Sequence, residues 1–180
     1  MRLIQNFSSL LVGTIFLPFF AFAANVEVTL IDELDGDLNS YCLDIVGGKL
    51  NANPEGGLQA HTCYSYQGEL GVDQAMDSDL ISQGIFKVVG FDVCMTQTGY
   101  VDGSKLALSS CTDARTQRFR LNGDGTITPS GSPGQCLTAG EETLLGNNGQ
   151  SRHQIKSLTI ESCGAVDKAY QQWRTRETDD

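Results

Sequence analysis

Short apolar stretches separated by turn residues make up most of the chain after residue 24. Val26, Val28 and Leu30 alternate with polar residues, and a period of two is typical of a β-strand with one buried face. Long segments with a period of 3.6 are missing, and the 20 glycines mark many turns. The pattern predicts an all-β fold whose first strand covers residues 26–31.

The start of the chain has a different pattern. Residues 10–20 are almost wholly apolar, Arg2 precedes them, and Ala21 and Ala23 match a small-residue cleavage site. The run is shorter than the roughly 20 residues of a membrane span. We therefore expect residues 1–23 to be a signal peptide and the protein to be secreted without membrane insertion. Its destination is the extracellular space or, for a bacterial source, alternatively the periplasm.

A threefold repeat is organised around six cysteines. Apolar residues stand five and three positions before the second cysteine of each neighbouring pair, so they should share the buried face of a strand: Leu58 and Ala60, Leu106 and Leu108, Leu158 and Ile160. Several residues after each second cysteine comes a motif of glutamine, any residue and a large apolar side chain. The three copies are Gln74-Ala75-Met76, Gln117-Arg118-Phe119 and Gln171-Gln172-Trp173. This recurrence predicts one domain over residues 24–175, with repeats at about 26–80, 81–122 and 123–175.

The repeat also guides the disulfide pairing. Six cysteines in an exported chain indicate three disulfides, and sequence alone allows about fifteen pairings. The repeat favours one bond within each copy: Cys42–Cys63, Cys94–Cys111 and Cys136–Cys163. Met76, Phe119 and Trp173 should meet in a core that the three copies share. Residues 176–180 are polar and predict a frayed tail.

The motifs Cys42-Leu43-Asp44 and Gln171-Gln172-Trp173, together with the paired cysteines, resemble the ricin B-type lectin family. The resemblance covers nearly all of the chain after the leader. It implies a β-trefoil, in which six strands close a barrel and six cap it, and non-catalytic binding of galactose-type glycans or glycoproteins. Met76 and Phe119 stand where that family usually has tryptophan.

The family's sugar site has matching residues only in the first repeat. Asp44, Gln59 and His61 supply a carboxylate, an amide and a flat ring, which suit sugar hydroxyls and the C–H face of a sugar ring. Because Gln59 and His61 alternate with core residues, we expect both to face outward. Asp73 and Gln74 resemble the pair that completes the family's site. The sequence thus predicts one weak, galactose-type site.

Plainer interpretations stay open for the same residues. Asp44 could cap a turn, His61 could be an ordinary surface residue, and Gln74 could support the core through hydrogen bonds. The trefoil would then be a scaffold without a sugar site. It would act as a protein-interaction module with a companion chain, of the toxin-subunit or protease-inhibitor type.

Charge and motif content narrow the function further. The 22 acidic residues exceed the 12 basic ones, and a net charge of −10 disfavours nucleic-acid binding. No nucleophile elbow, phosphate loop or zinc-protease motif occurs, and the only histidines are His61 and His153, the latter in a polar loop that we expect to be solvated. Asp35 and Asp37 lack the spacing of an EF-hand and predict a turn. We expect no enzyme activity, metal or cofactor.

Overall fold

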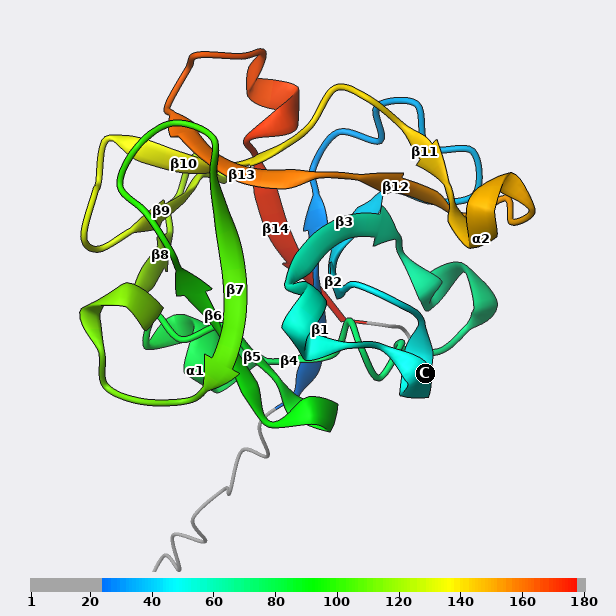
Figure 1. The fold of residues 1–180 in the computed structure, drawn as a ribbon, viewed down its shortest axis with the longest axis horizontal. Helices are drawn as coiled ribbons and strands as arrows, with labels where there is room; N and C mark the ends of the chain where they lie inside the picture. Colours follow the sequence, from blue (N-terminus) through cyan, green and yellow to red (C-terminus); the bar gives the residue numbers. More distant parts are fainter. Residues whose placement is uncertain (1–23, 178–180) are drawn as a thin grey trace, which may run out of the picture.

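The computed structural model describes residues 24–177, so the predicted signal peptide and residues 178–180 lie outside the described part. Figure 1 shows short strands wrapped around a common centre. The strands are β1 (Asn25–Leu30), β2 (Tyr41–Ile45), β3 (Leu58–Thr62), β4 (Met76–Asp77), β5 (Lys87–Val88), β6 (Val93–Gln97), β7 (Ser104–Ser110), β8 (Phe119–Leu121), β9 (Ile127–Pro129), β10 (Gln135–Ala139), β11 (Leu144–Leu145), β12 (Gln154–Lys156), β13 (Leu158–Ser162) and β14 (Trp173–Arg176).

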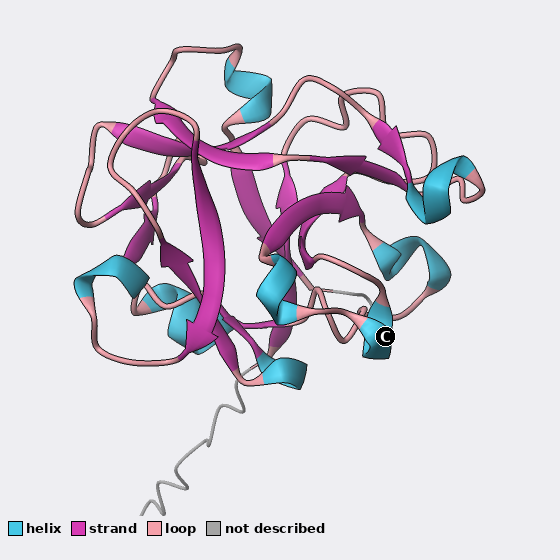
Figure 2. Ribbon diagram, viewed as in Figure 1, coloured by secondary structure: helices cyan, strands magenta, loops and turns pink. Residues whose placement is uncertain are grey.

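Helical segments are short and lie between the strands (Figure 2). The α-helical turns are α1 (Ser78–Ser82) and α2 (Gly146–Gly149), and the 3₁₀ turns are η1 (Lys49–Asn51), η2 (Pro54–Gly56), η3 (Tyr64–Gln67), η4 (Val89–Phe91), η5 (Arg115–Gln117) and η6 (Lys168–Tyr170). No helix within residues 24–177 has the length and apolar composition needed to cross a membrane.

Strand pairing gives the β-trefoil that the repeat predicted. β1 pairs with β14, β2 and β4, β4 pairs with β5, and β8 pairs with β9, which builds the barrel. The hairpins β2–β3, β6–β7 and β10–β13 are the three caps. Each cap hairpin carries its own disulfide, Cys42–Cys63, Cys94–Cys111 and Cys136–Cys163, so the predicted pairing is confirmed.

The shared core contains the three predicted anchor residues. Met76, Phe119 and Trp173 are 0%, 2% and 1% exposed and belong to one apolar cluster. The Trp173 Nε1–H donates to the Leu137 carbonyl at 3.1 Å, which satisfies the indole while its ring stays buried. The apolar residues before each second cysteine also pack on this core, although Leu108 is only partly buried.

The third repeat contains a hairpin beyond the twelve strands expected of the fold. β11 and β12 pair with each other between β10 and β13, and β12 then pairs with β3 of the first repeat. Ile155 faces His61 and Lys156 faces Ala60 in this register. The extra hairpin therefore brings side chains of the third repeat onto the first.

The C-terminal end departs from the prediction of a polar tail from residue 176. β14 pairs with β1 as far as Arg176, which lies opposite Glu27. The Arg176 guanidinium donates to Glu27 Oε2 at 2.8 Å, and Glu27 is fully buried. Strand pairing and this ion pair anchor a segment that has no apolar residue of its own after Trp173, so the predicted start of the tail is wrong.

Candidate functional site

The β2–β3 hairpin places three of the predicted sugar ligands on one face. Asp44 is the register partner of Gln59, and His61 is the partner of Cys42. Leu43 and Ala60 lie between them and face the core, so Asp44, Gln59 and His61 share the opposite face. The alternation along the sequence therefore predicted the side of the hairpin correctly.

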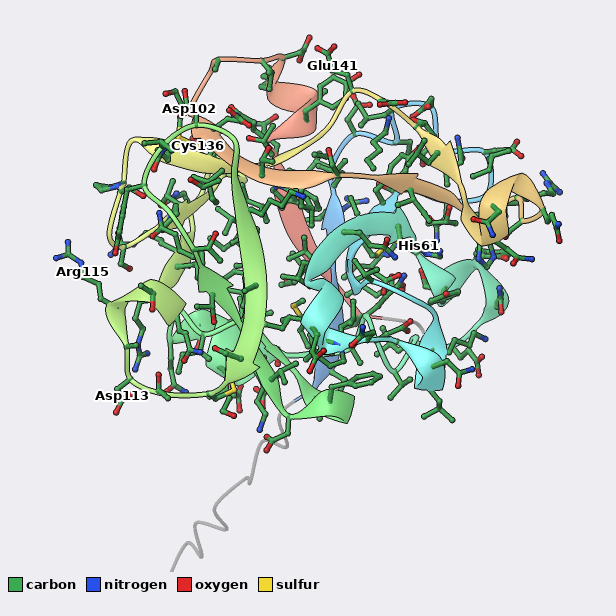
Figure 3. All side chains as sticks on the ribbon, viewed as in Figure 1. His61, Asp102, Asp113, Arg115, Cys136 and Glu141 are labelled. Carbon is green, nitrogen blue, oxygen red and sulfur yellow. A yellow bond between two sulfur atoms is a disulfide. The ribbon has the colours of Figure 1, made fainter. Side chains whose placement is uncertain are left out.

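The exposure of this face differs from the prediction. Asp44, Gln59 and His61 are 0%, 8% and 3% exposed, so the expectation that Gln59 and His61 are open to solvent is wrong. Figure 3 shows His61 beside the β3 ribbon, on the right of the view. Asp73 and Gln74 are also fully buried.

An aromatic cover explains the burial. The centre of the Tyr64 ring, at the start of η3, lies 5.1 Å from the centre of the His61 ring. The His153 ring lies edge-on to both, with its centre 5.1 Å from that of His61 and 5.4 Å from that of Tyr64. The Tyr66 hydroxyl and His153 Nε2 are 2.8 Å apart, and Lys49 Nζ stands 5.2 Å from the centre of the Tyr64 ring. His153 is half-buried rather than solvated as predicted, because the extra hairpin carries it onto the first repeat.

Gln74 connects the segments beneath this cover. Its Nε2 donates to Asp44 Oδ2 at 3.0 Å and to the Thr62 carbonyl at 3.2 Å, while its Oε1 accepts from the Tyr64 amide at 2.9 Å. Its side chain therefore has a structural role, as one of the plainer interpretations proposed.

The other two repeats contain the same arrangement. Gln117 donates to Thr96 and to the Ser110 carbonyl and accepts from the Thr112 amide. Gln171 does the same with equivalent partners: Thr138, the Ser162 carbonyl and the Gly164 amide. Each glutamine thus joins the two ends of its hairpin, and only the first repeat has a carboxyl group, that of Asp44, among the partners.

Asp73 approaches the same network from the other side. Its Oδ2 accepts a hydrogen bond from the backbone amide of Lys49, which holds η1 against the hairpin. The structure therefore brings Asp44, His61, Asp73 and Gln74 together, with Gln59 beside Asp44 in register.

Burial disfavours the charged forms of the titratable groups in this cluster. Desolvation raises the pKa of Asp44 well above its usual value, and the charge of Asp73 raises it further. Desolvation also raises the pKa of Asp73 and lowers the pKa of His61 to about 4. His61 Nδ1 is 3.2 Å from Asp44 Oδ2 and 2.8 Å from the Thr62 carbonyl, and the lowered pKa of His61 means that the first contact is not an ion pair at neutral pH.

Three buried polar atoms of the cluster have no partner within residues 24–177: Asp44 Oδ1, Asp73 Oδ1 and Gln59 Nε2. Unpaired buried polar groups are rare in folded proteins. The two Oδ1 atoms are carboxyl oxygens that can accept, and the Gln59 amide retains an unused donor. Hydroxyl groups that reached this face would find both acceptors and a donor.

Sequence reasoning missed the residues that cover the site. Tyr64 directly follows Cys63, in a segment to Gln74 that is longer than the corresponding segments Cys111 to Gln117 and Cys163 to Gln171, and this length is the one local signal. His153 lies far along the chain from the motif, and no local pattern connects it or Lys49 with the sugar-type residues.

The fold and this hairpin geometry match known proteins. The sequence profile of the ricin-type β-trefoil lectin domain family matches residues 32–148 and 82–180. The chain belongs to this family. Family and fold together indicate a lectin-like binding domain rather than a catalytic one.

A named relative matches part of the sequence, and two solved structures have a similar fold. A β-galactoside-specific lectin 4 from Viscum album is 34% identical over 62 residues, which cover 34% of this chain and 11% of the relative, so the match spans a small part of that protein. The agglutinin from Abrus precatorius has a TM-score of 0.59 at 21% identity, over 93% of this chain and 52% of its own. The C-terminal domain of an earthworm lectin, solved as a mutant with 6'-sialyllactose, has a TM-score of 0.54 at 16% identity, over 87% of this chain and 99% of its own.

Proposed function

We propose that this lectin-family domain binds galactose-type sugars weakly, at one site formed by Asp44, Gln59, His61, Asp73 and Gln74 in the first repeat. The observation that supports it is the shared face of the β2–β3 hairpin, where a carboxyl, an amide and a ring lie together with polar atoms that lack partners. A similar lectin carries β-galactoside specificity in its name, and another was solved with a sialylated lactose.

Binding at this face requires the aromatic cover to move. Asp44 is fully buried, and Tyr64 and His153 pack on the neighbouring His61 ring, so we expect a sugar to displace at least the Tyr64 ring. That displacement costs contact area and reduces affinity, because the binding-competent state is only partly populated. A single site of this kind is expected to bind in about the millimolar range, and a multivalent glycoprotein would bind more tightly by avidity.

The test uses Asp44→Asn, which keeps the size of the buried side chain but replaces one carboxyl oxygen by an amide NH2 group that only donates. The matched control is Thr96→Ser, at the equivalent position of the second repeat. We expect binding to galactose-bearing glycans on an array and in solution NMR, its loss in Asp44→Asn, and no change in Thr96→Ser. Loss of binding in both folded variants would contradict a site in the first repeat.

The closed cover favours a second candidate function. If Tyr64 and His153 stay in place, the trefoil is a scaffold that meets a companion protein through its loops. Failure of the folded protein to bind any galactose-bearing glycan at millimolar sugar would support this alternative.

We also propose that the protein is secreted. The apolar leader at residues 1–23 supports export, and the three disulfides suit an oxidising compartment. Immunodetection of a shortened, disulfide-bonded chain outside the producing cell tests this proposal, and detection of only the full-length chain inside the cell would contradict it.

A further inference from the structure

A group of arginines lies on the barrel, away from the first-repeat site. Phe119 is in the core, so Arg118 and Arg120 on either side of it point to the outer face of β8. Arg115 joins them from η5. Figure 3 shows Arg115 and Asp113 on the opposite side of the view from His61.

Two adjoining cavities follow this face. The first has a volume of about 660 Å³ and is lined by all three arginines together with Ile81, Phe119 and neighbouring residues of α1. The second has a volume of about 700 Å³ and is lined mainly by hydroxyl and amide side chains, such as those of Asn122 and Thr128. It also contains the Asp124 carboxylate, which accepts a hydrogen bond from the Thr126 hydroxyl at 2.7 Å. Arg120 and Ser130 line both, so the cavities form one groove along β8 and β9. Each volume lies in the range of small-ligand sites.

The arginines are held in place with donors left unused. Arg115 Nη2 donates to the Ser130 carbonyl at 3.2 Å. Arg118 donates to the Gln83 carbonyl at 3.1 Å and to Asp113 Oδ1 at 2.7 Å. Arg120 is exposed, and within the described residues its guanidinium makes no hydrogen bond or ion pair. A guanidinium has five N–H donors, so most of them remain available to a ligand.

The charge of the first cavity is opposite to that of the chain. Three guanidinium groups face one carboxylate there, Asp113, whereas the whole protein has a net charge of −10. Guanidinium groups bind planar or tetrahedral anions through paired hydrogen bonds. The hydroxyl and amide lining of the second cavity suits a neutral, hydroxyl-rich part of the same ligand.

We propose that this groove binds an acidic saccharide, with Arg118 and Arg120 holding its carboxylate or sulfate group and the second cavity holding the adjoining sugar. The site is separate from the first-repeat face, so it does not depend on galactose binding there. The volumes of the two adjoining cavities favour a chain of sugars over a single inorganic ion.

Titration calorimetry at low ionic strength tests the proposal with three probes: a heparin-derived tetrasaccharide, its desulfated form that keeps the carboxylates, and neutral maltotetraose. We expect an acidic probe to bind and the neutral one not to bind, and comparison of the two acidic probes tells whether sulfate or carboxylate is the preferred group. Excess galactose should not displace the acidic probe. Equal binding of maltotetraose, or no binding of either acidic probe, would overturn the proposal.

Two charge-matched variants separate a site from general attraction. Arg120→Gln removes one positive charge from the groove and no intramolecular contact, so the fold should persist. Lys105→Gln removes one charge from an exposed position on β7 that lines neither cavity. We expect affinity for the acidic probe to fall about ten-fold in the first variant and to stay within about two-fold in the second. Equal weakening in both would show non-specific attraction and overturn the assignment.

Discussion

The Tyr64 ring packs against Gly71 with no space for a methyl group. A Cβ placed on Gly71 would lie 2.3 Å from Tyr64 Cδ2 and 2.9 Å from Asp73 Oδ1. Gly71 therefore allows the cover to close over the first repeat. Its backbone contributes as well, because its carbonyl accepts from the amides of Gln74 and Ala75.

Gly71→Ala should open the cover. The added methyl forces the Tyr64 ring outward, so we expect stability to fall by about 1–3 kcal/mol and His61 to gain solvent. Urea unfolding measures the first effect and an NMR titration of His61 the second, with the pKa rising from about 4 toward its ordinary value. Gly134→Ala is the control, because its Cβ would meet nothing within 4 Å. An unchanged His61 titration in Gly71→Ala would show that the cover does not depend on this contact.

The three equivalent glutamines give the next prediction. Gln74, Gln117 and Gln171 each join the two ends of a hairpin through buried hydrogen bonds. Replacing any of them by alanine leaves backbone groups unpaired, so we expect each variant to lose about 1–3 kcal/mol of unfolding free energy.

Urea denaturation of the three alanine variants measures these losses side by side. Comparable losses would show that Gln74 serves the fold as the other two do. A Gln74→Ala variant as stable as the unmodified protein, beside two weakened ones, would contradict that role.

The cysteine-centred repeat explains why the fold could be predicted from the sequence. Residues close in sequence make up each cap hairpin, so a period of two identifies Leu58 and Ala60 as core residues, and the recurrence selects the disulfides. The side of the hairpin on which Asp44 lies follows from the same alternation. Each of these features depends on contacts within one repeat.

The cover over Asp44 could not be predicted in this way. His153 reaches His61 from the third repeat, through a hairpin that the other repeats lack. Strand periodicity tells which face of a strand points away from the core, but it does not tell whether another segment covers that face. The burial of the site is a tertiary effect, as is the anchoring of Arg176 by Glu27.

His61 should make stability depend on pH in a defined window. Its pKa is about 4 in the folded protein and 6.5 in the unfolded chain, because burial disfavours the charged ring. Between pH 4 and 6.5 the unfolded chain binds more protons than the folded protein. The stability that the neutral, buried His61 allows is therefore fully present above pH 6.5 and is lost as the pH falls toward 4. The full difference corresponds to about 3 kcal/mol.

The measurement compares urea unfolding of the protein and of His61→Gln from pH 4 to 7. We expect the unfolding free energy of the unmodified protein to rise more steeply with pH than that of His61→Gln, because only the unmodified protein has the buried imidazole. Asp44 acts in the opposite direction, since its raised pKa costs stability as the pH rises above its unfolded value, and its effect is present in both proteins. Identical slopes would show that His61 is protonated equally in the folded and unfolded states.

The last prediction concerns a buried lysine that connects the first and third repeats. Lys156 is 1% exposed, and its Nζ lies 2.9 Å from Asp35 Oδ1 and 3.1 Å from the Glu141 carbonyl. The Lys156 charge and hydrogen bonds from Thr143, Lys156 and Tyr41 outweigh desolvation and lower the pKa of Asp35 to about 2. Asp35 is half-exposed, so water solvates it if its partner is lost.

Because Lys156 is buried and Asp35 is half-exposed, we predict that replacing each of them has a different effect on stability. Asp35→Asn leaves a buried ammonium without a counter-charge, so we expect a loss of about 3 kcal/mol, whereas Lys156→Met removes the buried charge and leaves an apolar side chain, at a cost of about 1 kcal/mol or less. Urea unfolding of the two single variants and the double variant measures both costs and their coupling. If Lys156→Met were the more damaging change, the hydrogen bonds of the ammonium group, rather than its charge, would hold the extra hairpin against the first repeat.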